Sequence, residues 1–169
     1  MSELKWYCFR QNNTGGFFIT DDKVCHKIYI EAESFKEAVE KAEELGCYWN
    51  GVSSGHDCPC CGDRWNKWND DSMDFNEIQN KTFEADVFDD YYSDTVEKWN
   101  EMYGEFEIVE QPKFVTKWGK RYIGKIKIHT LEQYVQYEAN KYGWTTPDAR
   151  LYYANGNVIE IFSKREVSE

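Results

Sequence analysis

"VCHKIYIEAESFKEAVEKAEELG", residues 24–46, contains an alternating stretch followed directly by an amphipathic one. In the first part, apolar and polar side chains take turns: Val24, Ile28 and Ile30 are set against Lys27, Tyr29 and Glu31. Alternation with a period of two is typical of a strand with one face buried. We therefore predict a strand over residues 24–32.

The second part of this segment predicts the clearest helix of the chain. Ser34 is a good N-cap, and Glu37 three residues later completes a capping box. Gly46 is suited to end the helix in a left-handed conformation. The apolar residues fall on one helical face: Phe35, Ala38, Val39, Ala42 and Leu45.

Weaker signals on either side complete the predicted elements. Residues 4–22 indicate two strands around a turn at Asn13–Gly16. A second helix is expected to start at Asp94, and a third at Thr130, with Gln133 three residues on. Asn155–Gly156 between two alternating runs predicts a hairpin. Three further strands are expected in residues 105–110, 113–118 and 121–130.

These elements predict an α+β fold, with a mostly antiparallel sheet, about three helices and a cysteine-rich loop that zinc would staple. No strand–helix–strand rhythm recurs. At 169 residues the chain is expected to form a single domain. Its parts would be a strand-strand-helix-knuckle part over 1–68, an acidic segment over 70–110 and a strand-rich part over 111–169.

The chain is acidic, with a net charge of −11 and a pI of about 4.8, so no direct nucleic-acid binding is expected. From Asp70 to Glu110 there are fourteen Asp and Glu against two Lys, and from Lys113 to His129 six Lys and Arg and no acid. These runs are either solvated faces or surfaces for a charged partner. No apolar run has the length of a membrane helix or a signal peptide, so we expect no membrane contact and a reducing cytoplasm.

The loop "GHDCPCCGDRW", residues 55–65, contains a C-P-x-C-G knuckle whose Cys58 and Cys61 would aim two sulfurs at one ion. Structural zinc needs four ligands. The other two could come from His56 and Cys47, or from Cys25-His26. Cys60 is expected to point away, because it is adjacent to Cys61. The alternatives are free buried thiols, a redox C-x-x-C pair and catalytic zinc.

Two groups of residues are candidates for binding an anionic ligand. Arg64 would clamp a phosphate in a bidentate fork, with Trp65 or Trp68 stacking on a base. The turn of Asn13, Thr14, Gly15 and Gly16 would present backbone N–H groups to an anion. The structural alternatives are a capped knuckle, a core tryptophan and an ordinary hairpin turn.

No catalytic constellation is visible in the sequence, so we lean toward a protein that is not an enzyme. There is no G-x-S-x-G, no H-E-x-x-H and no H-x-E followed by C-x-x-C. Three histidines leave few general bases.

Residues 5–68 resemble a group of small, poorly characterised accessory proteins of tailed bacteriophages. The shared features are "YCFRQNNTGGFF", the strand–helix segment and the core "DCPCCGDRW", residues 57–65. Cys47 and His56 lie outside that core pattern. The resemblance implies a phage accessory protein in the cytoplasm of the bacterial host, where such proteins counter host defence.

Three functions follow as expectations. The first is a non-enzymatic binder, or sponge, that sequesters a small anionic, nucleotide-like immune signal, supported by an aromatic content of 17%. The second is an acidic inhibitor that mimics nucleic acid and blocks a host defence protein. The third is a metal-dependent enzyme that degrades the signal. A homo-oligomer is compatible with each of them.

Overall fold

A computed structural model describes residues 3–67, 72–73, 75–88, 96–115 and 121–164. The chain forms two compact units: residues 1–74 with 144–162, and residues 75–143 with 163–169. The second unit is thus an insertion in the first, followed by the C-terminal residues. The prediction of one domain over 1–169 did not distinguish these two units.

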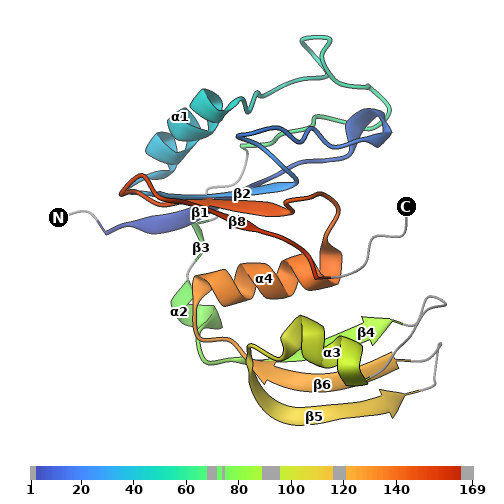
Figure 1. Cartoon of the computed structure of the whole chain (residues 1–169). Helices are drawn as coiled ribbons and strands as arrows, with labels where there is room; N and C mark the ends of the chain where they lie inside the picture. Colours follow the sequence, from blue (N-terminus) through green and yellow to red (C-terminus); the bar gives the residue numbers. More distant parts are fainter. Residues whose placement is uncertain (1–2, 68–71, 74, 89–95, 116–120, 165–169) are drawn as a thin grey trace. The chain divides into compact units, whose positions relative to one another are not determined.

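The first unit is built on a five-stranded sheet (Figure 1). In spatial order its strands are β3 (Ser72–Met73), β1 (Lys5–Arg10), β2 (Lys27–Ala32), β7 (Ala149–Tyr152) and β8 (Val158–Ile161). Neighbouring strands are antiparallel, except for β2 and β7, which pair in parallel. The mostly antiparallel α+β fold and the C-terminal hairpin are confirmed, with a single parallel pair added by the return of the chain from the second unit.

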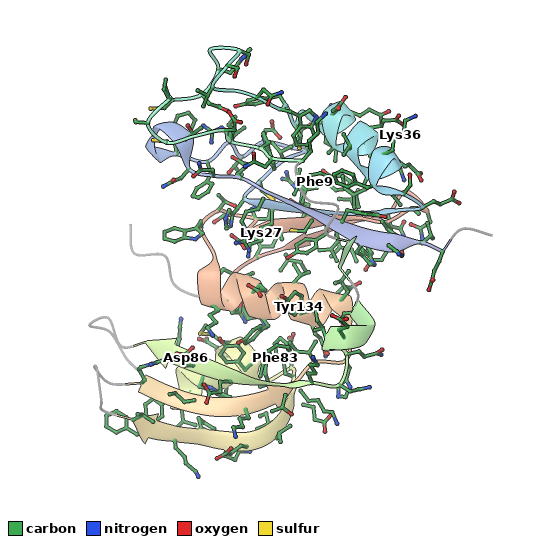
Figure 2. The ribbon with its side chains drawn as sticks, turned by 180° about the vertical axis from the view of Figure 1, so that it is seen from behind. Phe9, Lys27, Lys36, Phe83, Asp86 and Tyr134 are labelled. Carbon is green, nitrogen blue, oxygen red and sulfur yellow. The ribbon has the colours of Figure 1, made fainter. Side chains whose placement is uncertain are left out.

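Helix α1 (Phe35–Leu45) covers one face of this sheet, as its amphipathic pattern predicts (Figures 1 and 2). The Ser34 side chain accepts a hydrogen bond from the Glu37 backbone N–H, and Gly46 is left-handed at φ 112°. Beneath the helix lies an apolar core formed by Tyr7, Phe9, Ile28, Ile30, Ala32, Ala38 and Ala42. The capping box and the left-handed glycine are therefore confirmed.

The predicted hairpin around Asn13–Gly16 is wrong. Thr14–Gly16 form one 3-10 turn, and β1 pairs with β2 rather than with the residues that follow the turn. The backbone N–H of Asn12 instead donates to the carbonyl of Arg64, 2.8 Å away. The residues between β1 and β2 thus form a long loop that is tied to the cysteine-rich loop.

In the second unit, helices pack against a three-stranded antiparallel sheet (Figure 1). Its strands, in the order β4, β6, β5, are Thr82–Phe88, Arg121–Lys127 and Glu107–Val115. Its helices are α2 (Phe75–Ile78), α3 (Val96–Tyr103) and α4 (Leu131–Tyr142). In the described part of the chain, no helix is long and apolar enough to cross a membrane.

Several predicted elements of this unit are confirmed, and one strand was missed. Thr130 caps α4 by accepting from the Gln133 backbone N–H. The expected start of a helix at Asp94 lies outside the described residues. The strand expected over 105–110 and the first part of the one expected over 113–118 form the single, irregular strand β5, and residues 116–118 lie outside the described residues. Strand β4 was not predicted, because its acidic residues concealed the alternation of Phe83, Ala85 and Val87.

Trp99 of α3 is the centre of the second unit's core. Its side chain is fully buried, and its indole N–H donates to the Ala85 carbonyl at 2.9 Å. On the neighbouring strand, a Cβ at Gly124 would lie 2.5 Å from the Trp99 ring and 2.9 Å from the Glu110 carbonyl oxygen. On α4, the Tyr137 hydroxyl donates to the Glu84 carbonyl at 2.8 Å. The ring of Tyr134, on the same helix, lies 6.3 Å from the ring of Phe83 on β4 (Figure 2). This packing joins both helices to the sheet.

We expect Gly124→Ala to destabilise the protein by about 1–3 kcal/mol, because the added methyl group overpacks the contact with Trp99. Urea unfolding at 25 °C measures this change. Lys125→Ala, on the opposite face of the same strand, is the control and should cost about 1 kcal/mol or less. Equal losses for both variants would contradict the tight contact at Gly124.

Candidate functional site

A buried arginine joins the two long loops of the first unit. Arg64 is 3% exposed, and its guanidinium donates to the carbonyls of Phe17 at 2.7 Å and Thr14 at 2.9 Å. It also reaches the Gln11 side-chain oxygen and the Tyr48 hydroxyl, each at 3.3 Å. Arg64 therefore fixes the turn of residues 14–17 onto the cysteine-rich loop.

Asp57 supplies the acid for this arginine. Its Oδ1 lies 3.8 Å from Arg64 Nε and accepts a 2.6 Å hydrogen bond from the Tyr48 hydroxyl. Its Oδ2 accepts the Arg64 backbone N–H at 2.8 Å. A Cβ at Gly51 would lie 1.8 Å from Oδ2, so only glycine fits beside this carboxylate. The loop is thus built around a buried, hydrogen-bonded ion pair.

The structure contradicts the predicted ligand-binding roles of Arg64 and Trp65. The Arg64 donors are engaged by the protein, and Trp65 is 1% exposed within the core under α1. Both residues stabilise the cysteine-rich loop, as expected if "GDRW" has a structural role and does not bind a ligand. Trp68 lies outside the described residues.

Three thiols gather where the cysteine-rich loop turns back. The Sγ atoms of Cys58, Cys60 and Cys61 all lie within 4.8 Å of one another. Cys60 Sγ is 2.8 Å from Cys58 Sγ and 3.8 Å from Cys61 Sγ. The expectation that Cys60 points away from Cys61 is therefore wrong. Three close cysteines of this kind can hold a metal ion.

The backbone shapes this thiol cluster. The N–H groups of Cys61 and Gly62 both donate to the Cys58 carbonyl at 3.1 Å, and Gly62 has a φ of 90° that favours glycine. The Thr14 hydroxyl accepts the Cys58 N–H at 3.1 Å. The turn of residues 14–16 thus supports the thiol cluster directly.

The three thiols are chemically unequal. Hydrogen bonds from the Cys60 thiol, and then from backbone N–H groups, lower the pKa of Cys58. The same Cys58–Cys60 contact, seen from the other side, raises the pKa of Cys60 to about 11. Cys58 therefore ionises before Cys60.

The other predicted metal ligands lie elsewhere. Cys47 is buried in the core under α1, and burial raises its pKa to about 12. His56 is exposed, and its Nδ1 contacts the Ser54 hydroxyl at 2.8 Å. Neither belongs to the thiol cluster found among the described residues. The predicted set of Cys58, Cys61, Cys47 and His56 is thus replaced by three cysteines, of which the prediction contained two.

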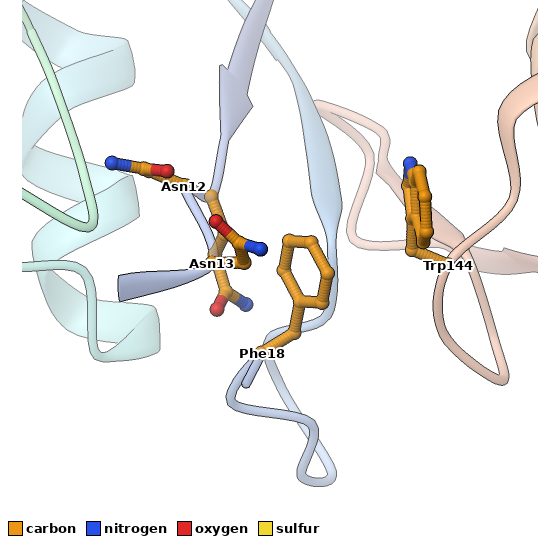
Figure 3. Close-up of a pocket in the computed structure, with 5 residues that line it drawn as sticks. Asn12, Asn13, Phe18 and Trp144 are labelled. Atoms are coloured by element: carbon orange, nitrogen blue, oxygen red, sulfur yellow. The ribbon is translucent and has the colours of Figure 1, made fainter. Parts of the chain in front are cut away.

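A pocket of about 240 Å³ lies beside the loop that follows β1 (Figure 3). Gln11, Asn12, Asn13, Phe18 and Trp144 line it. The Phe18 ring stands between Asn13 and Trp144, and its centroid is 6.3 Å from that of Trp144 at an interplanar angle of 31°. Of the predicted ligand-binding residues that the structure describes, only Asn13 lines this pocket. Thr14 is buried, with its hydroxyl and carbonyl engaged by Cys58 and Arg64.

The buried residues His26 and Asp148 support the aromatic side of the pocket. The His26 ring packs edge-on against Phe18 at 4.8 Å, and its Nδ1 lies 3.1 Å from Asp148 Oδ1. The same oxygen accepts the Trp144 backbone N–H at 2.8 Å. The hydrogen bond from His26 and that from Trp144 keep the pKa of Asp148 low despite its burial. Trp144 is thus anchored by its backbone while its side chain is 65% exposed.

The three amide side chains that line the pocket differ in how many hydrogen bonds they make within the protein. The Gln11 amide is engaged by Ile19, Cys25 and Arg64. Asn12 donates from Nδ2 to the Cys61 carbonyl at 2.6 Å, which connects the pocket to the thiol cluster. The exposed side-chain amide of Asn13 has no hydrogen-bond partner among the residues that the structure describes. It is therefore available to a ligand.

The charge runs of the sequence meet on the outer face of the three-stranded sheet. Asp86 pairs with Arg121, and Glu110 pairs with Lys125 at 3.4 Å and Lys113 at 3.3 Å. Glu107 pairs with His129. Within the described strands, the acidic and basic runs thus balance each other across the sheet, which supports a solvated face.

A family model described as "Domain of unknown function (DUF7296)" matches residues 4–168. No curated protein matches the chain, and no solved structure matches it.

We expect Arg64→Met to destabilise the protein by about 3 kcal/mol or more, because it removes the cation that balances the buried Asp57 carboxylate and leaves two carbonyls without their donor. Urea unfolding measures this loss. Arg10→Met, at an exposed position of β1, is the matched control and should change stability by about 0.5 kcal/mol or less. An unchanged midpoint for Arg64→Met would refute the anchoring role.

In metal-free, reduced protein, iodoacetamide should modify Cys58 before Cys60, since a lowered pKa populates the thiolate at lower pH. Peptide mapping by mass spectrometry between pH 6 and 9 gives the order. Exposure alone predicts the reverse order, because Cys60 is exposed and Cys58 half-buried. The buried Cys25 and Cys47, whose pKa values are raised to about 12, serve as internal controls and should stay unmodified.

Proposed function

The chain belongs to the family described as "Domain of unknown function (DUF7296)", and we propose that it is a non-enzymatic binding protein that sequesters a small nucleotide-like ligand. The observation that carries the proposal is the pocket around Phe18 and Trp144, where a highly exposed tryptophan faces a second aromatic ring. Exposed aromatic faces beside amide groups are typical of sites that bind planar, hydrogen-bonding ligands.

The chemistry of the lining favours the base of such a ligand over its phosphate. No ionisable side chain is among the five lining residues, and the nearby Arg64 is engaged within the loop frame. A heteroaromatic ring could stack on Trp144 or Phe18, while the Asn13 amide offers one donor and one acceptor side to the ring edge. Phosphates of a bound nucleotide would then extend toward solvent.

The same lining argues against turnover. Amides and aromatic rings supply no nucleophile and no general acid or base. His26 packs behind Phe18, and its Nδ1 contacts Asp148 Oδ1, the oxygen that also accepts the Trp144 backbone N–H. A ligand in this pocket would be held rather than converted.

The biological setting of the proposal comes from the resemblance of residues 5–68 to phage accessory proteins. In the cytoplasm of an infected bacterium, a protein that binds a nucleotide signal of host defence would lower its free concentration. Sequestration of this kind requires only affinity and abundance. The pocket and the phage resemblance together support this role.

The acidic inhibitor that mimics nucleic acid finds less support. Its carboxylates would have to face a partner, whereas Asp86, Glu107 and Glu110 are paired with cations of the neighbouring strand or of the residues after it. Residues 89–95, at the centre of the acidic run, lie outside the described residues.

We further propose that a structural zinc ion binds the thiol cluster. Zinc prefers thiolate ligands, and an ion on Cys58, Cys60 and Cys61 would cross-link the turn that Thr14 and Asn12 contact. The ion would act as a staple of the loop, with no part in chemistry. Metal analysis of the purified protein and its melting temperature with and without a chelator test this role.

Isothermal titration calorimetry should detect binding of nucleosides, nucleotides, cyclic dinucleotides or ADP-ribose, but not of inorganic phosphate. Trp144→Ala should weaken the binding by about 1–3 kcal/mol, the usual contribution of one stacked base. Phe162→Ala removes another exposed aromatic side chain of the same unit, outside the pocket, and should bind normally. The proposal fails if no compound binds more tightly than tens of micromolar, or if both variants behave alike.

A further inference from the structure

We infer that the thiol cluster forms a metal site with three protein ligands, whose fourth position stays open to solvent and takes a neutral external donor. The inference rests on the proposed zinc ion. It goes beyond a structural staple because it assigns to that ion an exchangeable coordination position. Three steps support it: the spacing of the sulfurs, the position of every other nearby candidate ligand, and the charge of the site.

The sulfur spacing fits one small ion. In a tetrahedral site with Zn–S bonds of about 2.3 Å, neighbouring sulfurs lie about 3.8 Å apart. Cys60 Sγ and Cys61 Sγ are already 3.8 Å apart. Cys58 Sγ and Cys60 Sγ, at 2.8 Å, need only to separate by about 1 Å, and the exposed Cys60 side chain has room to turn. The three sulfurs can therefore occupy three corners of one tetrahedron.

No fourth ligand joins these thiols in the described part of the chain. Cys47 is locked in the core beneath α1. His56 is two residues before Cys58, but its Nδ1 contacts Ser54 and its ring packs 5.6 Å from the Tyr48 ring. Asp57 is fully committed to Arg64 and Tyr48. The described residues thus supply three of the four ligands of a tetrahedral ion.

Exposure and charge define what the fourth ligand is. Cys60 and Cys61 are exposed, so the open corner can exchange with solvent. Three thiolates with a divalent ion carry a net charge of about −1, on a chain whose own net charge is −11. An anionic ligand would add to this negative charge, whereas a neutral donor would not. Water or an imidazole nitrogen is therefore the fitting class of ligand.

Cobalt(II) loading of the full-length, reduced protein tests the inference, because cobalt reports its ligands by absorption. We expect one cobalt per chain, a thiolate charge-transfer band, and visible bands that shift and saturate as imidazole is added. Chloride or azide at the same concentration should shift them less. Each single Cys→Ser variant of the cluster should lower the charge-transfer band by about one third or abolish binding, since one of three thiolates is lost.

His56→Ala is the decisive control. If His56 leaves the fourth position open, the variant keeps the cobalt spectrum and the response to imidazole. Two results would show that the protein itself closes the site: a wild-type spectrum that imidazole leaves unchanged, or a spectrum that His56→Ala alters. Either result overturns the open fourth position but leaves the structural zinc ion intact. Absence of cobalt and zinc binding overturns both. Ligand binding at the Trp144 pocket is measured separately by calorimetry, so its failure is distinguishable from either result.

Discussion

The organisation of the first unit depends on one buried cation. Arg64 lies in the cysteine-rich loop, yet its guanidinium binds carbonyls of Thr14 and Phe17, about fifty residues earlier in the chain. A buried guanidinium is tolerated only where its donors are used and an acid balances its charge. Asp57 and the loop carbonyls meet both conditions here. Two long loops with little regular structure are therefore held in one arrangement.

Both candidate sites derive from this arrangement. Asn12 lines the pocket and donates to the Cys61 carbonyl, while Thr14 accepts the Cys58 N–H. Because the same turn contacts both sites, a ligand in the pocket and a metal ion on the thiols would stabilise the same backbone conformation. By linkage, binding at one site would then favour binding at the other. The conformation they share is the one that Arg64 maintains.

The second unit has a different character. Its core is aromatic and centred on Trp99, and its outer sheet face carries ion pairs between acids and bases that are far apart in the sequence. These pairs cancel charge locally, and the exposed pair of Glu110 and Lys125 adds little to stability. A chain that is strongly acidic overall can thus present a nearly balanced surface on this sheet. The net charge of the chain therefore does not describe the local charge of this sheet face.

Local signals predicted much of the fold. The capping box at Ser34 and Glu37, the cap at Thr130 and the Asn155–Gly156 turn each act over a few residues, so they are legible in the sequence. Strand β4 was missed because its outward side chains are acidic. The hairpin at Asn13–Gly16 was wrong because long-range contacts decide this segment: β1 pairs with β2, and the distant Arg64 binds the carbonyls of Thr14 and Phe17.

The sequence by itself determined that the chain is an α+β protein with a tight, cysteine-rich turn, because capping, alternation and turn chemistry are local properties. Only the tertiary structure decided what the site residues do. Arginine and tryptophan are residue types common in ligand sites, but Arg64 and Trp65 are buried and stabilise the loops instead. Trp144 entered the pocket because the parallel pairing of β2 with β7 returns the chain beside Phe18. Burial and long-range pairing depend on the whole fold, and residue spacing does not encode them.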